Sequence, residues 1–281
     1  MSVGYGQRAK PMSYPNNQAP ASGIQPMDLG LSGAQVVITG ASAGIGLASA
    51  HAFAQAGADL TLVARNAVNL TAAATEIRSR YGVTVKPIAM DMASSPAVVE
   101  MINQCPEASV LVNNAGAVPA GSIESVDESA WRAAWDVKVF GYINATREML
   151  RHMVARRRGV IVNVIGGGVL NRYDYVCGTS GNAALSAFTQ AVGSHSTDHG
   201  VRVLGIHPPP TRTERYFALA RRRAKDRLGD ESRWKEALPD LPFGRLAEPQ
   251  EVAAMIVFAA SNQATYLSGT CITMDGGLAH R

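Results

Sequence analysis

The sequence predicts an α/β protein built on a doubly wound parallel sheet of about seven strands, with helices on both faces. Apolar runs of β-type residues alternate along the chain with stretches of helical character. These runs contain few polar residues, which is typical of parallel strands buried on both faces of a sheet. In such a sheet ligands bind beyond the carboxyl ends of the strands. We therefore expect the functional residues where the runs end.

The predicted elements follow one another from residue 31 onward. Residues 1–30, rich in Pro, Gly, Ser, Asn and Gln, indicate a flexible N-terminal tail or an arm lying on a neighbouring subunit. Strands are expected at 35–39, 59–64, 84–89, 109–113, 159–165, 201–206 and 270–274. Helices are expected near 44–56, 66–81, 95–104, 127–157, 180–199 and 248–261.

The first strand leads into a Gly-rich turn and then an Ala-rich helix. Residues 36–46 read Val-Val-Ile-Thr-Gly-Ala-Ser-Ala-Gly-Ile-Gly, and the glycines allow a sharp turn that a ligand can approach closely. The helix start directs free N–H groups and a partial positive charge toward this turn, which suits a pyrophosphate. The alternative is a plain strand–loop–helix with incidental glycines. The expected cofactor-binding residues are Thr39, Gly40, Ser42, Ala43, Gly44, Ile45 and Gly46.

The end of the second strand favours NADP(H) over NAD(H). A dinucleotide site usually has Asp or Glu near this point, where it binds the ribose 2′-hydroxyl. Here the strand ends without an acidic residue, and Arg65 stands in its place. A guanidinium at this position can pair with a 2′-phosphate. The alternative is an exposed arginine at a helix start, which would leave NAD(H) possible.

The fourth strand ends in Asn113-Asn114-Ala115-Gly116. Together with the spacing Thr-Gly-x-x-x-Gly-x-Gly, this motif resembles the short-chain dehydrogenase/reductase superfamily, over about residues 31–278. The resemblance implies a Rossmann-type fold and an NAD(P)-dependent oxidoreductase acting on an alcohol or carbonyl substrate. It also implies further cofactor contacts, at Asp91, Met92, Asn114, Ala115, Gly116, Pro208 and Thr213.

The chain departs from the family pattern at the four positions that usually carry hydride chemistry. The family uses a Tyr, a Lys four residues later, a Ser after the fifth strand and an Asn in the middle helix. Aligned on the family motifs, Gly178 takes the Tyr position and Asn182 the Lys position. Gly166 stands at the Ser position and Lys138 at the Asn position. The resemblance therefore implies an atypical catalytic site.

Tyr175 is the candidate for the missing acid–base group. It precedes Asn182 by seven residues, so both would share a helix face if the helix begins early. Because a tyrosine has a pKa near 10, a nearby cation must favour its phenolate, and Lys138 is the expected partner. The expected catalytic residues are thus Tyr175, Asn182 and Lys138. The alternatives are Tyr175 packed as a loop aromatic beside Tyr173, and His207 either as an acid–base group or as a packed structural histidine.

The departures leave two other functions open. A non-redox enzyme of the dehydratase, cyclase or isomerase type would keep the cofactor scaffold, because function resides in the site rather than in the fold. A catalytically inactive cofactor-binding partner subunit would keep the scaffold as well.

The resemblance also implies the domain organisation. Residues 31–281 are expected to form a single Rossmann-type dinucleotide-binding domain, with a substrate lid at about 211–240. Apolar lid residues suggest a small, partly apolar substrate. The basic run at 221–223 is interpreted either as a solvated helix face or as a contact for an acidic substrate. A homodimer or homotetramer is implied, through the helices at 127–157 and 180–199.

The composition limits the binding partners and the cellular compartment that we expect for this protein. The net charge is +4, but the basic runs at 156–158 and 221–223 lack interleaved aromatics, so nucleic-acid binding is not expected. The three cysteines lack metal or redox spacing, which indicates no metal site and reduced thiols in a cytoplasmic protein. No apolar run reaches the roughly 18 residues that cross a membrane, and no signal-peptide core is expected at the N-terminus.

Overall fold

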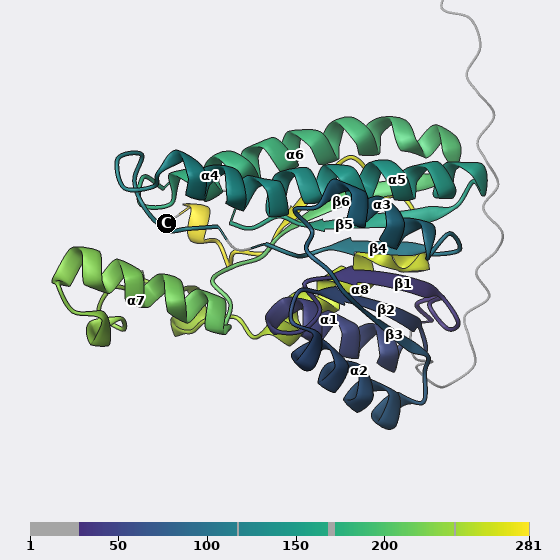
Figure 1. Cartoon of the computed structure of the whole chain (residues 1–281), viewed down its shortest axis with the longest axis horizontal. Helices are drawn as coiled ribbons and strands as arrows, with labels where there is room; N and C mark the ends of the chain where they lie inside the picture. Colours follow the sequence, from purple (N-terminus) through teal and green to yellow (C-terminus); the bar gives the residue numbers. More distant parts are fainter. Residues whose placement is uncertain (1–27, 117, 168–171, 239, 281) are drawn as a thin grey trace, which may run out of the picture.

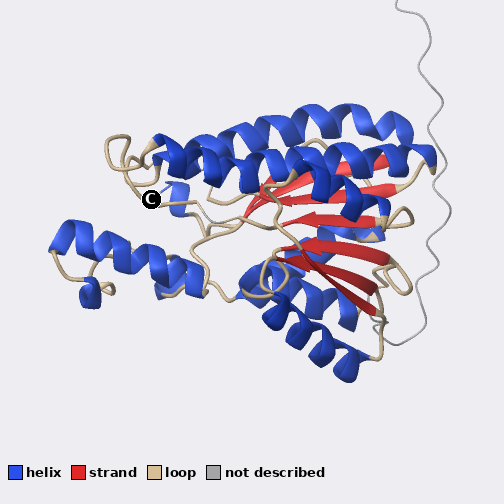
Figure 2. Cartoon of the chain, viewed as in Figure 1, coloured by secondary structure: helices blue, strands red, loops and turns tan. Residues whose placement is uncertain are grey.

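The structure is a computed structural model that describes residues 28–116, 118–167, 172–238 and 240–280. Its centre is one sheet of seven strands in the order β3-β2-β1-β4-β5-β6-β7 (Figures 1 and 2). Every neighbouring pair is parallel, as expected. The strands are β1 (Gln35–Thr39), β2 (Asp59–Ala64), β3 (Val85–Ala89), β4 (Val110–Asn113), β5 (Gly159–Val164), β6 (Val201–His207) and β7 (Cys271–Thr273).

Helices cover both faces of the sheet (Figure 1). Adjacent strand residues point to opposite faces, so Val36 and Ile38 enter one apolar core while Val37 enters the other. The first core is completed by α1 (Gly44–Gln55), α2 (Ala67–Tyr81) and α8 (Pro249–Ala260). The second core is completed chiefly by α3 (Ser95–Asn103) and α5 (Gly141–Ala155). The predicted fold class is therefore confirmed.

A chain of hydrogen bonds between buried side chains connects the central strands to the helix layer, and we call it the polar ladder. Asn113 on β4 donates its Nδ2 to Asn163 Oδ1 on β5 over 2.9 Å. Asn163 in turn donates its Nδ2 to Thr189 Oγ1 on α6 (Val176–Ser196), also over 2.9 Å. Buried amides need such partners, because an unsatisfied one costs about 1–3 kcal/mol. The ladder thus fixes the strand ends around which the site is built.

The long middle helix expected at 127–157 is interrupted. The structure has α4 (Glu128–Trp135), a π-helix at Asp136–Phe140 and then α5. A π-helical turn is rare and is frequent at functional sites, because the extra residue changes the direction of its side chains. Lys138 is the central residue of this turn. In addition, α6 begins at Val176, earlier than the expected residue 180.

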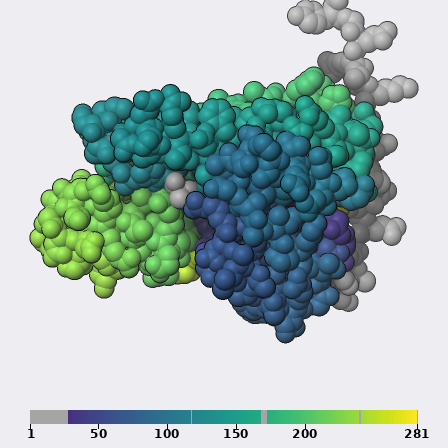
Figure 3. All heavy atoms as spheres, in the orientation of Figure 1, coloured from purple at the N-terminus to yellow at the C-terminus, as the bar shows by residue number. Residues whose placement is uncertain are grey.

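The predicted lid contains α7 (Glu214–Leu228), which projects from the body of the molecule (Figures 1 and 3). Ala220 and Ala224 are its buried residues. Short 3₁₀ helices complete the described chain, at Thr197–His199, Glu231–Arg233, Pro242–Gly244, Asn262–Ala264 and Leu278–His280.

The last residues of the predicted tail contact the domain. The carbonyl oxygens of Asp28 and Leu29 accept hydrogen bonds from the Gln263 side chain and the Asn262 main chain, over 2.7 and 3.0 Å. The remainder of the predicted tail, residues 1–27, lies outside the described residues. Across the described ranges, none of the helices combines the length and apolar character needed to span a membrane.

Candidate active site

The turn after β1 has the shape that its glycines predict. Gly40 and Gly44 have φ values of +67° and +56°, a conformation that side-chain-bearing residues rarely adopt. A Cβ on Gly46 would lie only 2.2 Å from the carbonyl oxygen of Gly40. The turn is therefore a tight cradle at a helix start, and it fits the pyrophosphate of a dinucleotide.

Thr39 and Asn114 join the carboxyl ends of β1 and β4. The Thr39 hydroxyl oxygen accepts the main-chain N–H groups of Asn114 and Ala115 over 2.9 and 3.0 Å. The Asn114 amide donates back to the carbonyl oxygens of Thr39 and Gly40. These strands lie at the point where the strand order reverses, which is where such folds bind dinucleotides.

A cavity of about 940 Å³ opens beside the hydrogen bonds between Thr39 and Asn114, between the strand ends and α7. It brings together residues that were expected to bind the cofactor and residues that were expected to be catalytic. The predicted residues lining it are Gly40, Ala43, Gly44, Ile45, Asn114, Ala115, Gly116, Lys138, Tyr175, Pro208 and Thr213. The predicted residues that do not line it are Thr39, Ser42, Gly46, Arg65, Asp91, Met92 and Asn182.

The residues expected around the adenosine half lie at the neighbouring strand ends. Arg65 is exposed directly after β2, and Asp91 is exposed after β3. The Asp91 carboxylate accepts the main-chain N–H of Ala93 over 3.0 Å. The Met92 side chain is buried in the second apolar core, so it packs rather than facing a ligand.

Lys138 extends from the π-helix toward the end of β5. Its Nζ donates to the carbonyl oxygen of Val164 over 2.9 Å and to the Tyr142 hydroxyl over 3.3 Å. A Cβ on Gly116 would lie 2.6 Å from Lys138 Cδ, so this glycine makes room for the lysine. Burial, reinforced by the nearby charge of Arg215, lowers the pKa of Lys138 to about 7.

Tyr175 stands at the N-cap of α6, and its ring fills the space beside Gly178. A Cβ on Gly178 would lie 2.1 Å from Tyr175 Cε1 and 2.2 Å from Cζ. Burial raises the pKa of Tyr175, and the adjacent Arg215 guanidinium opposes that rise. The cations that act on this phenol are therefore Arg215 and, more weakly, Arg223, whereas the sequence predicts Lys138. The ammonium of Lys138 is instead directed at the Val164 carbonyl.

Asn182 and His207 enclose the loop that follows β5. A Cβ on Gly166 would lie 2.8 Å from Asn182 Nδ2, so the buried amide occupies the space of a side chain at 166. His207 donates its Nδ1 proton to the Gly166 carbonyl over 2.6 Å, and its Nε2 lies 3.2 Å from Ser186 Oγ. Burial lowers the pKa of His207 and keeps the ring neutral. These contacts match the alternative of a packed structural histidine.

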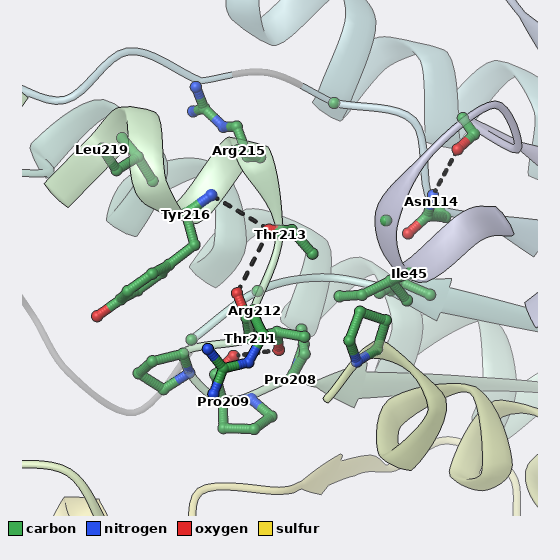
Figure 4. Close-up of a pocket in the computed structure, with 18 of the residues that line it drawn as sticks. Ile45, Asn114, Pro208, Pro209, Thr211, Arg212, Thr213, Arg215, Tyr216 and Leu219 are labelled. Carbon is green, nitrogen blue, oxygen red and sulfur yellow. Dashed lines mark hydrogen bonds between the residues drawn. The ribbon is translucent and has the colours of Figure 1, made fainter. Parts of the chain in front are cut away.

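The loop after β6 leads into the lid. Thr213 accepts the main-chain N–H of Tyr216 on its hydroxyl over 3.1 Å and so caps α7 (Figure 4). Its methyl carbon would lie 3.2 Å from a Cβ on Gly44, so the lid packs against the phosphate turn. Thr213 was expected to bind the cofactor, but this cap already uses its hydroxyl as an acceptor. Pro209 takes the position of the family's glycine, and its carbonyl accepts the Thr211 hydroxyl.

Among the cavity residues are three that sequence analysis did not assign to the site and a fourth that it gave only as part of a basic run able to contact an acidic substrate. They are Arg172, Arg215, Tyr216 and Arg223, from the loop before α6 and from α7. Arg223 belongs to a basic run whose other two members are exposed. The i, i+3, i+7 spacing of Tyr216, Leu219 and Arg223 could have indicated that they share one face of a helix. No group of metal-binding side chains occurs among the described residues.

The parallel sheet, the glycine cradle at its switch point and the adjoining cavity define a dinucleotide-binding enzyme of the α/β class. A model of the short chain dehydrogenase family matches residues 34–223. The chain belongs to this family, as the sequence motifs predicted. It is an NAD(P)-dependent oxidoreductase of alcohol and carbonyl substrates.

Relatives with solved structures or known activities support this assignment. Galactitol 2-dehydrogenase (L-tagatose-forming) of Cereibacter sphaeroides is 32% identical over 250 residues, covering 88% of this chain and 95% of the relative. The 2-keto-3-deoxy-L-fuconate dehydrogenase of Xanthomonas campestris pv. campestris is 32% identical over 257 residues, covering 88% and 80%. L-sorbose reductase from Gluconobacter frateurii, solved with NADPH and L-sorbose, has a TM-score of 0.82 at 32% identity, covering 91% and 100%.

Proposed function

We propose that this chain is an NADP(H)-dependent oxidoreductase of a small polyhydroxylated substrate, with Tyr175 as its proton donor and acceptor. The observation that carries the proposal is the position of the Tyr175 ring, in the space that a side chain at 178 would enter. The family motif has its acid–base tyrosine at position 178. Glycine there and a tyrosine three residues earlier therefore place a phenol near the same point of the cavity.

The environment of Tyr175 suits proton donation during carbonyl reduction. Burial raises the pKa of its hydroxyl, so the group is protonated at neutral pH. The bound nicotinamide supplies hydride to the carbonyl carbon. Tyr175 gives its proton to the carbonyl oxygen, and the Arg215 guanidinium stabilises the resulting phenolate. In alcohol oxidation the same hydroxyl, as phenolate, takes the proton.

Asn182 and Lys138 are proposed to complete the atypical site. The buried Asn182 amide fills the space above Gly166, where the family has a serine hydroxyl, and it would position the Gly166 loop at the cavity wall without contacting the substrate. Lys138 replaces the family's asparagine and holds the Val164 carbonyl. It would position the strand end under the reacting centre, rather than act on Tyr175 directly.

The cofactor preference rests on Arg65, which is exposed at the end of β2. A guanidinium there can pair with a 2′-phosphate. Nicotinamide fluorescence should show tighter binding of NADPH than of NADH, and Arg65→Glu should reverse that order. Equal affinities in both proteins would contradict the preference and leave the cofactor site intact.

The substrate class rests on the relatives. Their names give galactitol, 2-keto-3-deoxy-L-fuconate and L-sorbose, all small and polyhydroxylated. These names favour a polyhydroxylated substrate over the partly apolar one that the lid composition suggested. A cytoplasmic location and a homo-oligomer remain predictions from the sequence.

The deciding experiment compares Tyr175→Phe with Tyr173→Phe. Tyr173 is exposed, with its hydroxyl bonded to Glu124, so it is a matched control. Loss of the Tyr175 hydroxyl should lower kcat about 10²- to 10⁴-fold while NADPH binding stays unchanged. Tyr173→Phe should retain both.

Similar turnover in the two variants would sink the Tyr175 mechanism. NADPH binding without oxidoreductase activity toward polyols or their ketones would favour a non-redox enzyme or an inactive partner subunit.

A further inference from the structure

One end of the cavity is lined by a cluster of three arginines, defined here as Arg172, Arg215 and Arg223. Arg172 comes from the loop before α6, and the other two come from α7. The cluster surrounds the phenol of Tyr175, whose pKa responds to both Arg215 and Arg223. It therefore lies next to the group that is proposed to exchange the substrate's proton.

The positive charge of this cluster exceeds the negative charge around it. Asp174 binds Arg172 through both carboxylate oxygens, over 3.0 and 3.1 Å, and lies 3.2 Å from Arg223 Nε. The Arg172 hydrogen bond holds the pKa of Asp174 below its usual value, so this carboxylate is ionised. Within the described ranges, no second carboxylate lies within ion-pair distance of the three arginines. The partly charged ammonium of Lys138 adds to the excess.

Tyr216 carries a buried polar group without a partner among the described residues, and Arg223 has only its ion pair with Asp174. Only 11% of the Arg223 side chain is exposed, yet its Nε makes no well-aligned hydrogen bond with the described residues. The Tyr216 hydroxyl is also buried, and it too lacks a hydrogen-bond partner among them. Buried donors of this kind are normally paired, because leaving one unpaired costs about 1–3 kcal/mol.

These two side chains lie on one face of α7. Tyr216 and Arg223 are seven residues apart, with Leu219 between them, and all three line the cavity. Figure 4 shows Tyr216 and Arg215 leaving the start of the helix in different directions. Arg215 therefore acts most strongly on Tyr175, whereas Tyr216 leaves the helix on another side and lines the cavity together with Arg223.

We propose that the substrate carries an anionic group, a carboxylate or a phosphate, and that Arg223, Arg172 and Tyr216 bind it. The guanidinium N–H groups of Arg223 and Arg172 that do not face Asp174 can donate to the oxygens of either group, and the Tyr216 hydroxyl can donate a further hydrogen bond. This inference rests on the proposed function, because it assigns one end of the same substrate. The reacting carbon then lies at Tyr175 and the anion lies toward the lid, so the substrate is a hydroxy or keto acid or a sugar phosphate.

The test uses compounds that share a polyhydroxylated carbon chain and differ in the charge of their terminal group. Aldonic acids of four to six carbons are compared with the neutral alditols of the same length and with alditol phosphates, as ligands of the NADPH-loaded protein. Thermal unfolding gives the affinity for each compound. We expect at least one anionic series to bind about tenfold or more tightly than its neutral match. Tighter acids identify a carboxylate, and tighter phosphates identify a phosphate ester.

Variants of neighbouring arginines show where the anion binds. Arg223→Gln should weaken binding of the anions much more than binding of the neutral alditols, so that the preference for the anion is lost. Arg221→Gln, at an exposed position of the same helix, should retain the preference. Equal affinities for acid, phosphate and alditol would overturn the inference. So would an Arg223→Gln variant that weakens every compound alike, because the arginine would then only fasten the lid to Asp174.

The two proposals fail in different ways. Failure to bind NADPH, or absence of any hydride transfer with alditols, acids and phosphates, would overturn the proposed function. Turnover of neutral alditols with no advantage for the anions would leave that function standing and overturn the anion site alone.

Discussion

In the proposed mechanism, the pH dependence of the reaction depends on the pair formed by Arg215 and Tyr175. Burial raises the pKa of the phenol, and Arg215 opposes that rise because it stabilises the phenolate. Alcohol oxidation needs the phenolate, so its rate should increase with pH through and beyond the neutral range. In Arg215→Gln the pKa should rise further, and the ascending limb of the pH–rate profile should move to higher pH.

A matched control separates this effect from a general loss of positive charge. Arg221→Gln removes the same charge from an exposed position of α7 and should leave the profile unchanged. If the limb stays in place in Arg215→Gln, or moves equally in both variants, Arg215 does not tune Tyr175.

Lys138 should make the stability of the protein depend on pH. Burial lowers its pKa from 10.5 to about 7, so the folded state disfavours the ammonium that the unfolded chain retains. Between these values the unfolded state binds more protons, and the contribution of Lys138 to stability rises with pH. The penalty is therefore largest below pH 7 and disappears above about pH 10.5. Lys138→Met should be more stable than the parent below pH 7, by about 2 kcal/mol after allowance for solvent in the cavity.

The measurement is the free energy of unfolding in denaturant, followed from about pH 6 to about pH 10. Lys86 is exposed, and Lys86→Met is the control because an exposed lysine gives no such pH-dependent difference. A stability difference between Lys138→Met and the parent that stays constant over this range would show that the ammonium is not disfavoured.

At the scale of elements, the stability of the lid helix α7 depends on Thr213, the residue at its N-cap. Thr213 caps α7 and also packs against Gly44 of the phosphate turn. Thr213→Ala should lose about 1 kcal/mol of helix stability, as other N-cap replacements do. Amide exchange in α7 should accelerate and KM for substrate should rise, because α7 carries cavity residues.

Thr213→Ser keeps the capping oxygen and should restore slow exchange in α7 and the parent KM. If both variants behave like the parent, the lid is ordered by its other contacts, such as the ion pair between Arg212 and Glu248. If both behave like each other but not like the parent, the methyl contact with Gly44 matters more than the cap.

Elements with strong local signals were predicted almost to the residue. The expected strand at 35–39 is Gln35–Thr39 in the structure, and the one at 59–64 is Asp59–Ala64, because buried parallel strands are apolar throughout. The interruption at Asp136–Phe140 was not predicted. A π-helical turn differs from an α-helical one by a single residue, and the apolar pattern around it stays helical.

At the scale of the whole molecule, the glycine turn was predictable from the sequence, whereas the meeting of three arginines near Tyr175 was not. Gly40 and Gly46 lie in one motif, so their spacing in the sequence already describes the turn they form. Arg172, Arg215 and Arg223 meet only because the lid folds back toward the loop before α6. Their sequence neighbours carry no trace of that contact, and a basic run such as 221–223 is usually a solvated helix face. In the sequence alignment, Gly178 stands where the family has its tyrosine. In the structure the ring of Tyr175 packs beside Gly178, which makes Tyr175 the candidate for that role.

The outer face of α6 gives the last prediction, which concerns assembly. Ala183, Ala184, Ala187 and Ala191 are exposed there, and small apolar residues along one helix favour close packing against another helix. We expect a homodimer or homotetramer in solution, with α6 in the interface. Ala187→Glu would place a charge in that interface and should shift the mass measured by light scattering toward the monomer. Ala72→Glu, on exposed α2 across the sheet, should retain the parent mass. An Ala187→Glu protein that keeps an oligomeric parent's mass would place the interface elsewhere, and a monomeric parent would rule out assembly altogether.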